Sequence, residues 1–167
     1  MTIEAQLREL NAAQIQAGMI IGPAFSTILD LVLKHGRRYT LKPLPEGRWH
    51  GDFQLCFANA LRAAKAGRWI YVEGYAIRHG TGGTAVLHAW VTDPNDPTVA
   101  YDPTWSDGAE YFGIPFRVDY VLAMRKKAGH PGVLDAWELR WPLVTGADRI
   151  EDVIWRANGD PAGAELV

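Results

Sequence analysis

The chain has 167 residues, of which 48% are hydrophobic and 22% charged, an ordinary composition for one folded domain with a substantial core. Its net charge of −2 argues against nucleic acid as a partner, because phosphate binding requires concentrated positive charge. No apolar run approaches the length of a membrane span, and the polar N-terminus lacks a signal-peptide pattern, so we expect no membrane partner. The single cysteine excludes an internal disulfide, and we expect a cytoplasmic protein.

Residues 1–36 predict a helical lead-in. Apolar residues at helical spacing favour a first helix over residues 3–17. Pro23 is well placed to open a second helix, and Gly36 ends it. That second helix carries a wide apolar stripe formed by Phe25, Ile28, Leu29, Val32 and Leu33.

The only cysteine lies near the start of the next predicted helix. Residues 37–51 are basic and rich in Pro and Gly, with a short strand at 39–41, and they lead to Asp52, a good N-cap. Helical spacing then continues to a stop at Gly67. Cys56 therefore falls in or just after the first turn, where free N–H groups and the helix dipole favour a thiolate.

After this helix the pattern changes to that of strands. Residues 69–77, 85–92 and 98–102 predict an antiparallel meander, with a turn at 80–83 and a five-residue connection at 93–97. Pro103 ends the third strand because it cannot donate to a ladder. Glu73 points away from the face of Val72 and Ala76. It is either a functional residue or part of an exposed strand face.

The remaining chain predicts smaller elements. Residues 111–116 form an aromatic turn or short strand, 117–127 a helix, and Asp148 caps a short helix that contains Ile150, Val153 and Ile154. Residues 133–144 favour neither helix nor strand. The polar residues 158–167 predict a mobile tail. We therefore expect one α+β domain over 1–157, with a lead-in at 1–36, a core at about 48–116 and a helical region at 117–157.

Three residues on these elements predict a nucleophilic site. A thiol nucleophile requires a base within hydrogen-bond reach, and the base requires an acceptor that orients it. Cys56 opens a helix, His88 lies within the second strand, and Asp102 ends the third. Because a residue before proline adopts extended geometry, Asp102 can point across to His88 on the neighbouring strand.

These three segments resemble the signature segments of the transglutaminase-like superfamily. The resemblance rests on Cys56 at a helix start, on His88-Ala89-Trp90-Val91 and on Asp102-Pro103-Thr104-Trp105, and it covers about residues 51–116. Residues 71–76 and 111–116 are similar to small bacterial and phage members. The resemblance implies a papain-like fold, with N-terminal helices and a nucleophile helix packed on an antiparallel sheet. It also implies a Cys-His-Asp triad that needs no cofactor.

The function implied is that of a cysteine peptidase or amidase, or of a transglutaminase-like acyltransferase. Cys56 would attack an amide of a peptide or protein and form a thioester, His88 would act as base and then acid, and Asp102 would orient it. Acidic calcium-binding clusters have no counterpart here, which argues against calcium-dependent cross-linking. The Cys56 N–H would hold the oxyanion. Candidates for the second donor and the cleft are Gln54, His50, Trp49, Trp90 and Trp105.

Two other interpretations stay open at this point. A metal site could use His50, Asp52, Cys56 and His88, although these residues lack the paired short spacings of zinc sites. Alternatively, the fold serves as a catalytically silent binding module, such as a host-protein inhibitor or an assembly factor. The retention of all three triad residue types favours the enzyme. Substrate, acyl acceptor and oligomeric state do not follow from the sequence.

Overall fold

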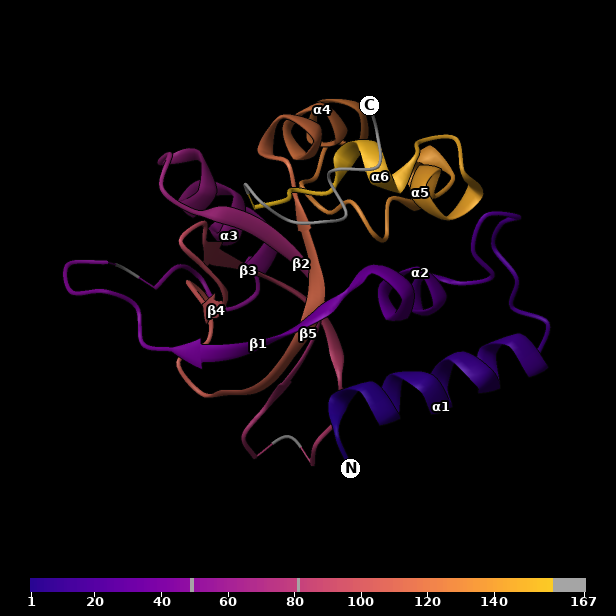
Figure 1. Cartoon of the computed structure of the whole chain (residues 1–167), viewed down its shortest axis with the longest axis horizontal. Helices are drawn as coiled ribbons and strands as arrows, with labels where there is room; N and C mark the ends of the chain where they lie inside the picture. The colour runs from indigo at the N-terminus through magenta and orange to yellow at the C-terminus, as the bar shows by residue number, and fades with distance from the viewer. Residues whose placement is uncertain (49, 81, 158–167) are drawn as a thin grey trace.

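The computed structural model describes residues 1–48, 50–80 and 82–157. Over these ranges the chain is a mixed α/β protein whose five strands close into a barrel in the order β1-β4-β3-β2-β5 (Figure 1). The predicted combination of helices and strands is confirmed. The elements are α1 (Ile3–Gln16), α2 (Ile28–His35), β1 (Arg37–Lys42), α3 (Cys56–Lys65), β2 (Ile70–Arg78), β3 (Val86–Asp93), β4 (Asp96–Tyr101), β5 (Gly108–Phe116), α4 (Val118–Ala128), the 3-10 helix η1 (Trp137–Leu139), α5 (Pro142–Thr145) and α6 (Ile150–Val153).

The lead-in contains both predicted helices, but α2 begins five residues later than predicted. Pro23 does not open it. The N-cap is Thr27, whose hydroxyl accepts the Asp30 N–H at 2.9 Å. The Asp30 carboxylate in turn accepts the Ser26 N–H at 3.1 Å. This reciprocal pair satisfies two backbone donors at once, an advantage that a helix begun at Pro23 would not have.

The sheet differs most from the prediction. The meander of β2, β3 and β4 is confirmed as antiparallel, but the sheet is a closed barrel and not an open antiparallel sheet. The segment predicted as a turn or short strand is β5, a nine-residue strand that pairs with both β2 and β1. β1 closes the barrel by pairing in parallel with β4. Such pairing joins distant parts of the chain, so local sequence patterns do not reveal it.

The connection between β3 and β4 is also tighter than predicted. β3 continues to Asp93 and β4 begins at Asp96, so only Pro94 and Asn95 lie between the strands. The Asp93 carboxylate accepts the Asn95 N–H at 2.8 Å and so supports the turn. The short hairpin keeps β4, and therefore Asp102 just beyond it, beside β3.

Two glycines allow β2 and β5 to approach closely. Gly74 and Gly113 are partners in the register of these strands. A Cβ on Gly74 would overlap the Gly113 Cα and the Phe112 carbonyl, and both are backbone atoms that cannot move aside. This explains why a glycine is tolerated in the middle of each strand.

We expect Gly74→Ala to lower the free energy of unfolding by about 3 kcal/mol, because the added methyl group meets backbone. Urea unfolding followed by circular dichroism measures the change. Gly132→Ala is the control, because its Cβ would meet only side chains, that of His130 at 3.3 Å and that of Phe57 at 3.8 Å. Equal losses in the two variants would contradict the close approach as the cause.

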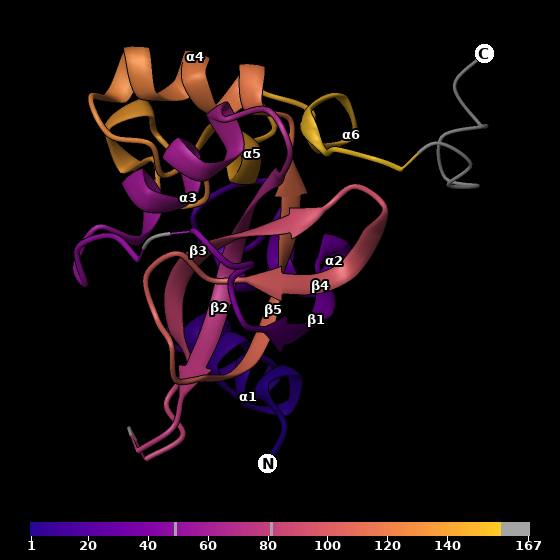
Figure 2. The ribbon, with the colours of Figure 1, turned by 90° about the vertical axis from the view of Figure 1, so that its left-hand side faces the viewer.

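The core has two parts, because alternate residues of each strand face opposite sides of the barrel wall. An inner cluster fills the barrel and consists of Tyr39, Val72, Ala76, Trp90, Ala100, Trp105 and Tyr111. Residues of the other parity, such as Tyr71 and Ala89, join the helices in a larger outer cluster. Figure 2 shows α1 at one end of the barrel and α3, α4 and α5 at the other.

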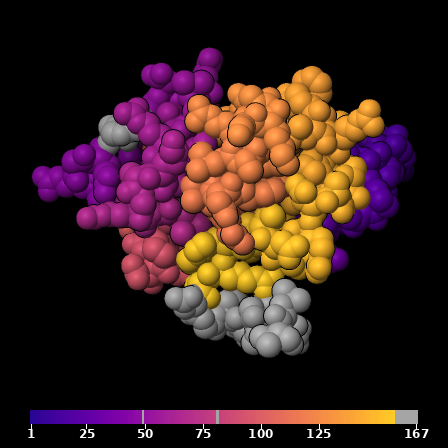
Figure 3. All heavy atoms as spheres, turned by 90° about the horizontal axis from the view of Figure 1, so that it is seen from above, coloured from indigo at the N-terminus to yellow at the C-terminus, as the bar shows by residue number. Residues whose placement is uncertain are grey.

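The C-terminal elements cover the end of the barrel near α3. α4 is confirmed and ends at the left-handed Gly129. Asp148 does not cap α6, whose N-cap is Arg149; the Asp148 carboxylate instead accepts the Tyr120 hydroxyl at 2.9 Å. Seen from above, the segment from α4 to α6 covers most of this surface, with residues around α3 at its side (Figure 3). The predicted mobile tail lies outside the described residues.

Within the described ranges, none of the helices combines the length and apolar character required to cross a membrane.

Candidate thiol site

Cys56 is the first residue of α3, close to its predicted position. The predicted N-cap is wrong, however: Leu55 occupies that position and provides no side-chain cap. Asp52 contributes through its backbone, because its carbonyl accepts the Leu55 N–H at 3.0 Å and the Asn59 side-chain amide at 2.8 Å. The Cys56 N–H belongs to the first turn, where backbone donors have no partner within the helix.

The environment of the Cys56 thiol opposes ionisation. The side chain is half-buried, and burial raises the pKa of the thiol to about 11. Hydrogen bonding to the backbone of Ala89 and Phe57 lowers this pKa, whereas the charges of Glu73 and Asp102 raise it further. The expected preference for a thiolate is therefore outweighed by burial in this conformation. At neutral pH the thiol requires a base.

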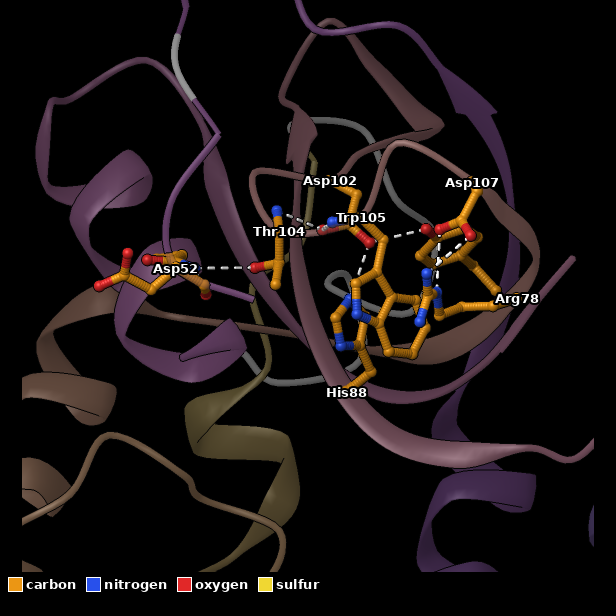
Figure 4. A network of polar contacts seen from close by, with 9 residues as sticks. Asp52, Arg78, His88, Asp102, Thr104, Trp105 and Asp107 are labelled. Carbon is orange, nitrogen blue, oxygen red and sulfur yellow. Dashed lines mark hydrogen bonds and ion pairs between the residues drawn. The ribbon is translucent and has the colours of Figure 1, made fainter. Parts of the chain in front are cut away.

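His88 and Asp102 form a buried pair (Figure 4). The His88 Nε2 and the Asp102 Oδ2 are 2.7 Å apart, and the two side chains are 1% and 0% exposed. His88 lies on β3, and Asp102 follows β4 directly, as predicted. Because a carboxylate only accepts, Nε2 carries the proton and Nδ1 keeps a lone pair. His88 Nδ1 is therefore the atom that can act as a base.

Three further donors converge on the Asp102 carboxylate. Oδ1 accepts the backbone N–H groups of Thr104 at 2.7 Å and Trp105 at 3.0 Å. Oδ2 accepts the Tyr111 hydroxyl at 2.7 Å, in addition to His88. A buried charge that receives hydrogen bonds at both oxygens is held in one orientation. The geometry suits an aspartate that orients a histidine.

Of the two tryptophans proposed for the cleft, Trp105 lines a cavity beside the pair and Trp90 does not. Trp105 is buried, and its ring stacks on the His88 ring with centroids 3.7 Å apart, so it covers the imidazole. Trp90 is fully buried in the inner cluster and lines no cleft. The alternation of β3 directs Trp90 into the barrel.

Hydrogen bonds join α3 to the turn that carries Asp102. The Asn59 side-chain amide, one turn into α3, donates to the Thr104 hydroxyl at 3.0 Å. The Gly51 N–H donates to the Pro103 carbonyl at 2.7 Å. The residues before and within α3 are thereby held against residues 103–104. Sequence reasoning missed Asn59, although a polar residue on the apolar face of a helix is a signal that could have identified it.

The three predicted triad residues are neighbours, but the triad is not fully connected. The Cys56 thiol bonds the backbone of Ala89, the residue that follows His88 on β3. The described residues include no hydrogen bond between Cys56 and His88. The His88 ring lies on the inner side of the barrel wall, against Trp90 and Trp105, whereas α3 packs on the outside. Proton transfer from the thiol to the imidazole therefore requires one of the two side chains to move.

A cavity of about 340 Å³ lies beside the pair. Its lining includes His50, Asp102 and Trp105, together with the segment 41–48, but neither Cys56 nor His88. His50 lines this cavity, and its predicted role in a substrate cleft stays a prediction. Gln54 is exposed and precedes the helix, and Trp49 lies outside the described residues. Among the residues that the structure describes, no second oxyanion donor is identified.

Glu73 is the charged strand residue for which the sequence left two interpretations open. It is fully buried on the outer face of β2, where the interpretation as an exposed strand face is wrong. Its oxygens accept the N–H groups of Val133 and Leu134, both at 2.8 Å, and the Tyr71 hydroxyl at 2.9 Å. Burial raises the pKa of Glu73 to about 7. Its register partner on β3 is Ala89, which contacts Cys56.

The metal site considered from the sequence is not formed. Within residues 1–48, 50–80 and 82–157, no three His, Cys, Asp or Glu side chains are grouped so that they could hold a metal ion.

Comparison of the chain with protein-family models, with curated proteins and with solved structures finds no match. The fold and the site define a mixed α/β protein with a five-stranded barrel, in which a buried His-Asp pair lies beside a half-buried cysteine. The resemblance to the transglutaminase-like superfamily stays a prediction.

Proposed function

We propose that the protein is a thiol enzyme of transglutaminase-like type, with a papain-like core, that hydrolyses or transfers the acyl group of an amide in a peptide or protein. The observation that carries the proposal is the buried His88–Asp102 pair, 2.7 Å apart, one residue along β3 from the backbone that Cys56 contacts. Location in the reducing cytoplasm, where a single thiol stays free, belongs to the same proposal.

The reaction begins with proton transfer from Cys56 to Nδ1 of His88. The raised thiol pKa favours this step over a thiolate–imidazolium pair that exists in advance. The thiolate attacks the carbonyl carbon, and the Cys56 N–H donates to the oxyanion. The imidazolium then protonates the leaving amine and a thioester remains. Water or an amine attacks the thioester and restores the thiol.

Acylation by an activated ester tests this proposal. We expect p-nitrophenyl acetate to acetylate Cys56, detected by intact mass spectrometry, and His88→Gln to slow acetylation by about 10²- to 10⁴-fold through loss of the base. His79→Gln, an exposed histidine at the end of β2, is the matched control. Cys56→Ser should abolish the thioester. Peptide amides then identify the carbonyl that is attacked.

A binding module is the second candidate, because the thiol has a raised pKa and forms no hydrogen bond to His88 among the described residues. In that case wild type and His88→Gln would acetylate at the same slow rate. That result would overturn the enzyme proposal. It would leave the buried pair with a structural role only.

A further inference from the structure

Asp102 Oδ2 accepts two hydrogen bonds of equal length, and only one of the two donors belongs to the predicted triad. The His88 Nε2 and the Tyr111 hydroxyl both lie 2.7 Å from this oxygen. Tyr111 comes from β5, the strand that the sequence analysis did not recognise at full length. It is 1% exposed and packs at 5.1 Å, edge to face, on Trp90. This packing inside the barrel therefore points the Tyr111 hydroxyl at the Asp102 carboxylate.

The hydroxyl position is built into the backbone. Gly108 opens β5, and a Cβ at this position would overlap the Tyr111 hydroxyl and ring. Burial and the charge of Asp102 raise the pKa of Tyr111 far above its ordinary value. The hydroxyl therefore stays protonated and acts as a permanent donor to Asp102.

We infer that Tyr111 is a positioning residue that lowers the proton affinity of His88 by sharing Asp102 Oδ2 with it. The inference rests on the proposed function in so far as His88 acts as a base there. Each hydrogen bond withdraws negative charge from the carboxylate oxygen. With Tyr111 in place, Asp102 stabilises the imidazolium less than it would alone. A less basic His88 stays neutral at lower pH values, and in the neutral form it can accept the thiol proton.

The other charged and titratable groups around His88 do not replace this effect. Arg78 lies over Trp105, 5.3 Å from its ring, and is paired to Asp107 at 2.7 Å. Trp105 itself separates that ion pair from the imidazole. Cys56 lies beyond the backbone of Ala89, and Glu73 lies on the outer face of β2. Tyr111, in contrast, donates to the same Asp102 oxygen as His88.

The test follows the His88 ring Cε1–H by NMR across pH, with assignment from His88→Gln. In Tyr111→Phe we expect the His88 titration midpoint to rise by about one pH unit, because Oδ2 then serves His88 alone. The midpoint of the acidic limb in the pH–rate profile of Cys56 acetylation should rise by the same amount. Tyr39→Phe is the matched control, because Tyr39 is also buried against Trp90 but its hydroxyl accepts from Arg37.

A second measurement does not depend on the folding of Tyr111→Phe. Replacing all six tyrosines with 3-fluorotyrosine makes the hydroxyl a stronger donor, so the His88 midpoint should move down. A midpoint that is unchanged in both proteins would overturn the inference and assign Tyr111 a packing role. If the midpoint moves but the rate of Cys56 acetylation does not depend on the protonation state of His88, the inference holds and the proposed function fails.

Discussion

Replacing Asp102 with asparagine is expected to slow acetylation of Cys56 by about 10³- to 10⁴-fold at neutral pH. The carbonyl oxygen of the introduced amide can still accept the N–H groups of Thr104 and Trp105, so the amide nitrogen takes the place of Oδ2. That nitrogen donates towards His88 Nε2, which must then accept. The proton of the neutral imidazole moves to Nδ1, and the lone pair that would receive the thiol proton is lost.

The measurement compares initial acetylation rates of wild type and Asp102→Asn across pH, together with their thermal unfolding. Asp96→Asn serves as the control, because Asp96 begins β4, the strand that Asp102 follows, but is bonded to Lys42 and Thr98 at the surface. We expect this control to react like wild type. An Asp102→Asn protein that is folded and reacts within a few-fold of wild type would contradict the role of the pair.

Replacing Glu73 with glutamine is expected to remove a pH dependence of stability of about 3 kcal/mol. In wild type, burial raises the pKa of Glu73 from 4.5 to about 7. The folded protein therefore binds this proton more tightly than the unfolded chain. The stabilisation is complete below pH 4.5 and decreases as the pH rises to about 7. The glutamine side chain carries no such proton.

Urea unfolding is measured at several pH values between roughly 4 and 8, a range that spans this window. The effect is the difference in the free energy of unfolding between wild type and Glu73→Gln. As the pH rises, wild type should lose stability relative to Glu73→Gln. Glu138→Gln is the control, because Glu138 is paired with His130 near the surface. A constant difference between wild type and Glu73→Gln would mean that Glu73 titrates normally. The Tyr71 hydroxyl can accommodate either state, since the Pro131 carbonyl lies 3.4 Å away as an alternative acceptor.

Glu73 also illustrates how far a strand pattern extends. Alternation along β2 correctly predicts that Glu73 faces away from Val72 and Ala76, which lie in the inner cluster. Whether that other face is exposed depends on what packs over it. Residues 133–134 do so, from a segment that favoured neither helix nor strand. The direction of the side chain is local information, and its burial is not.

The position of Cys56 shows the same limit for a helix. Helical spacing and Gly67 predict α3, and Cys56 is indeed at its start. The expected thiolate depends on the solvent around that helix end. In the folded chain, burial raises the thiol pKa to about 11, against the hydrogen bonds from Ala89 and Phe57. Desolvation thus outweighs the local effect of the first turn.

The sequence by itself determined the presence of α1, α2, α3, α4 and α6, the three strands of the meander, and the adjacency of His88 and Asp102. Each of these follows from periodicity, from a breaker such as Pro103, or from a short hairpin, all of which act over a few residues. Only the tertiary structure decided the closure of the barrel by β1 and β5. It also decided the hydrogen bonds of Tyr111 and Asn59 and the burial of Glu73. The contacts of Asn59 and Glu73 join residues far apart in the chain. Tyr111 is only nine residues from Asp102, but it faces the carboxylate because β5 pairs with β2 and β1 in the barrel.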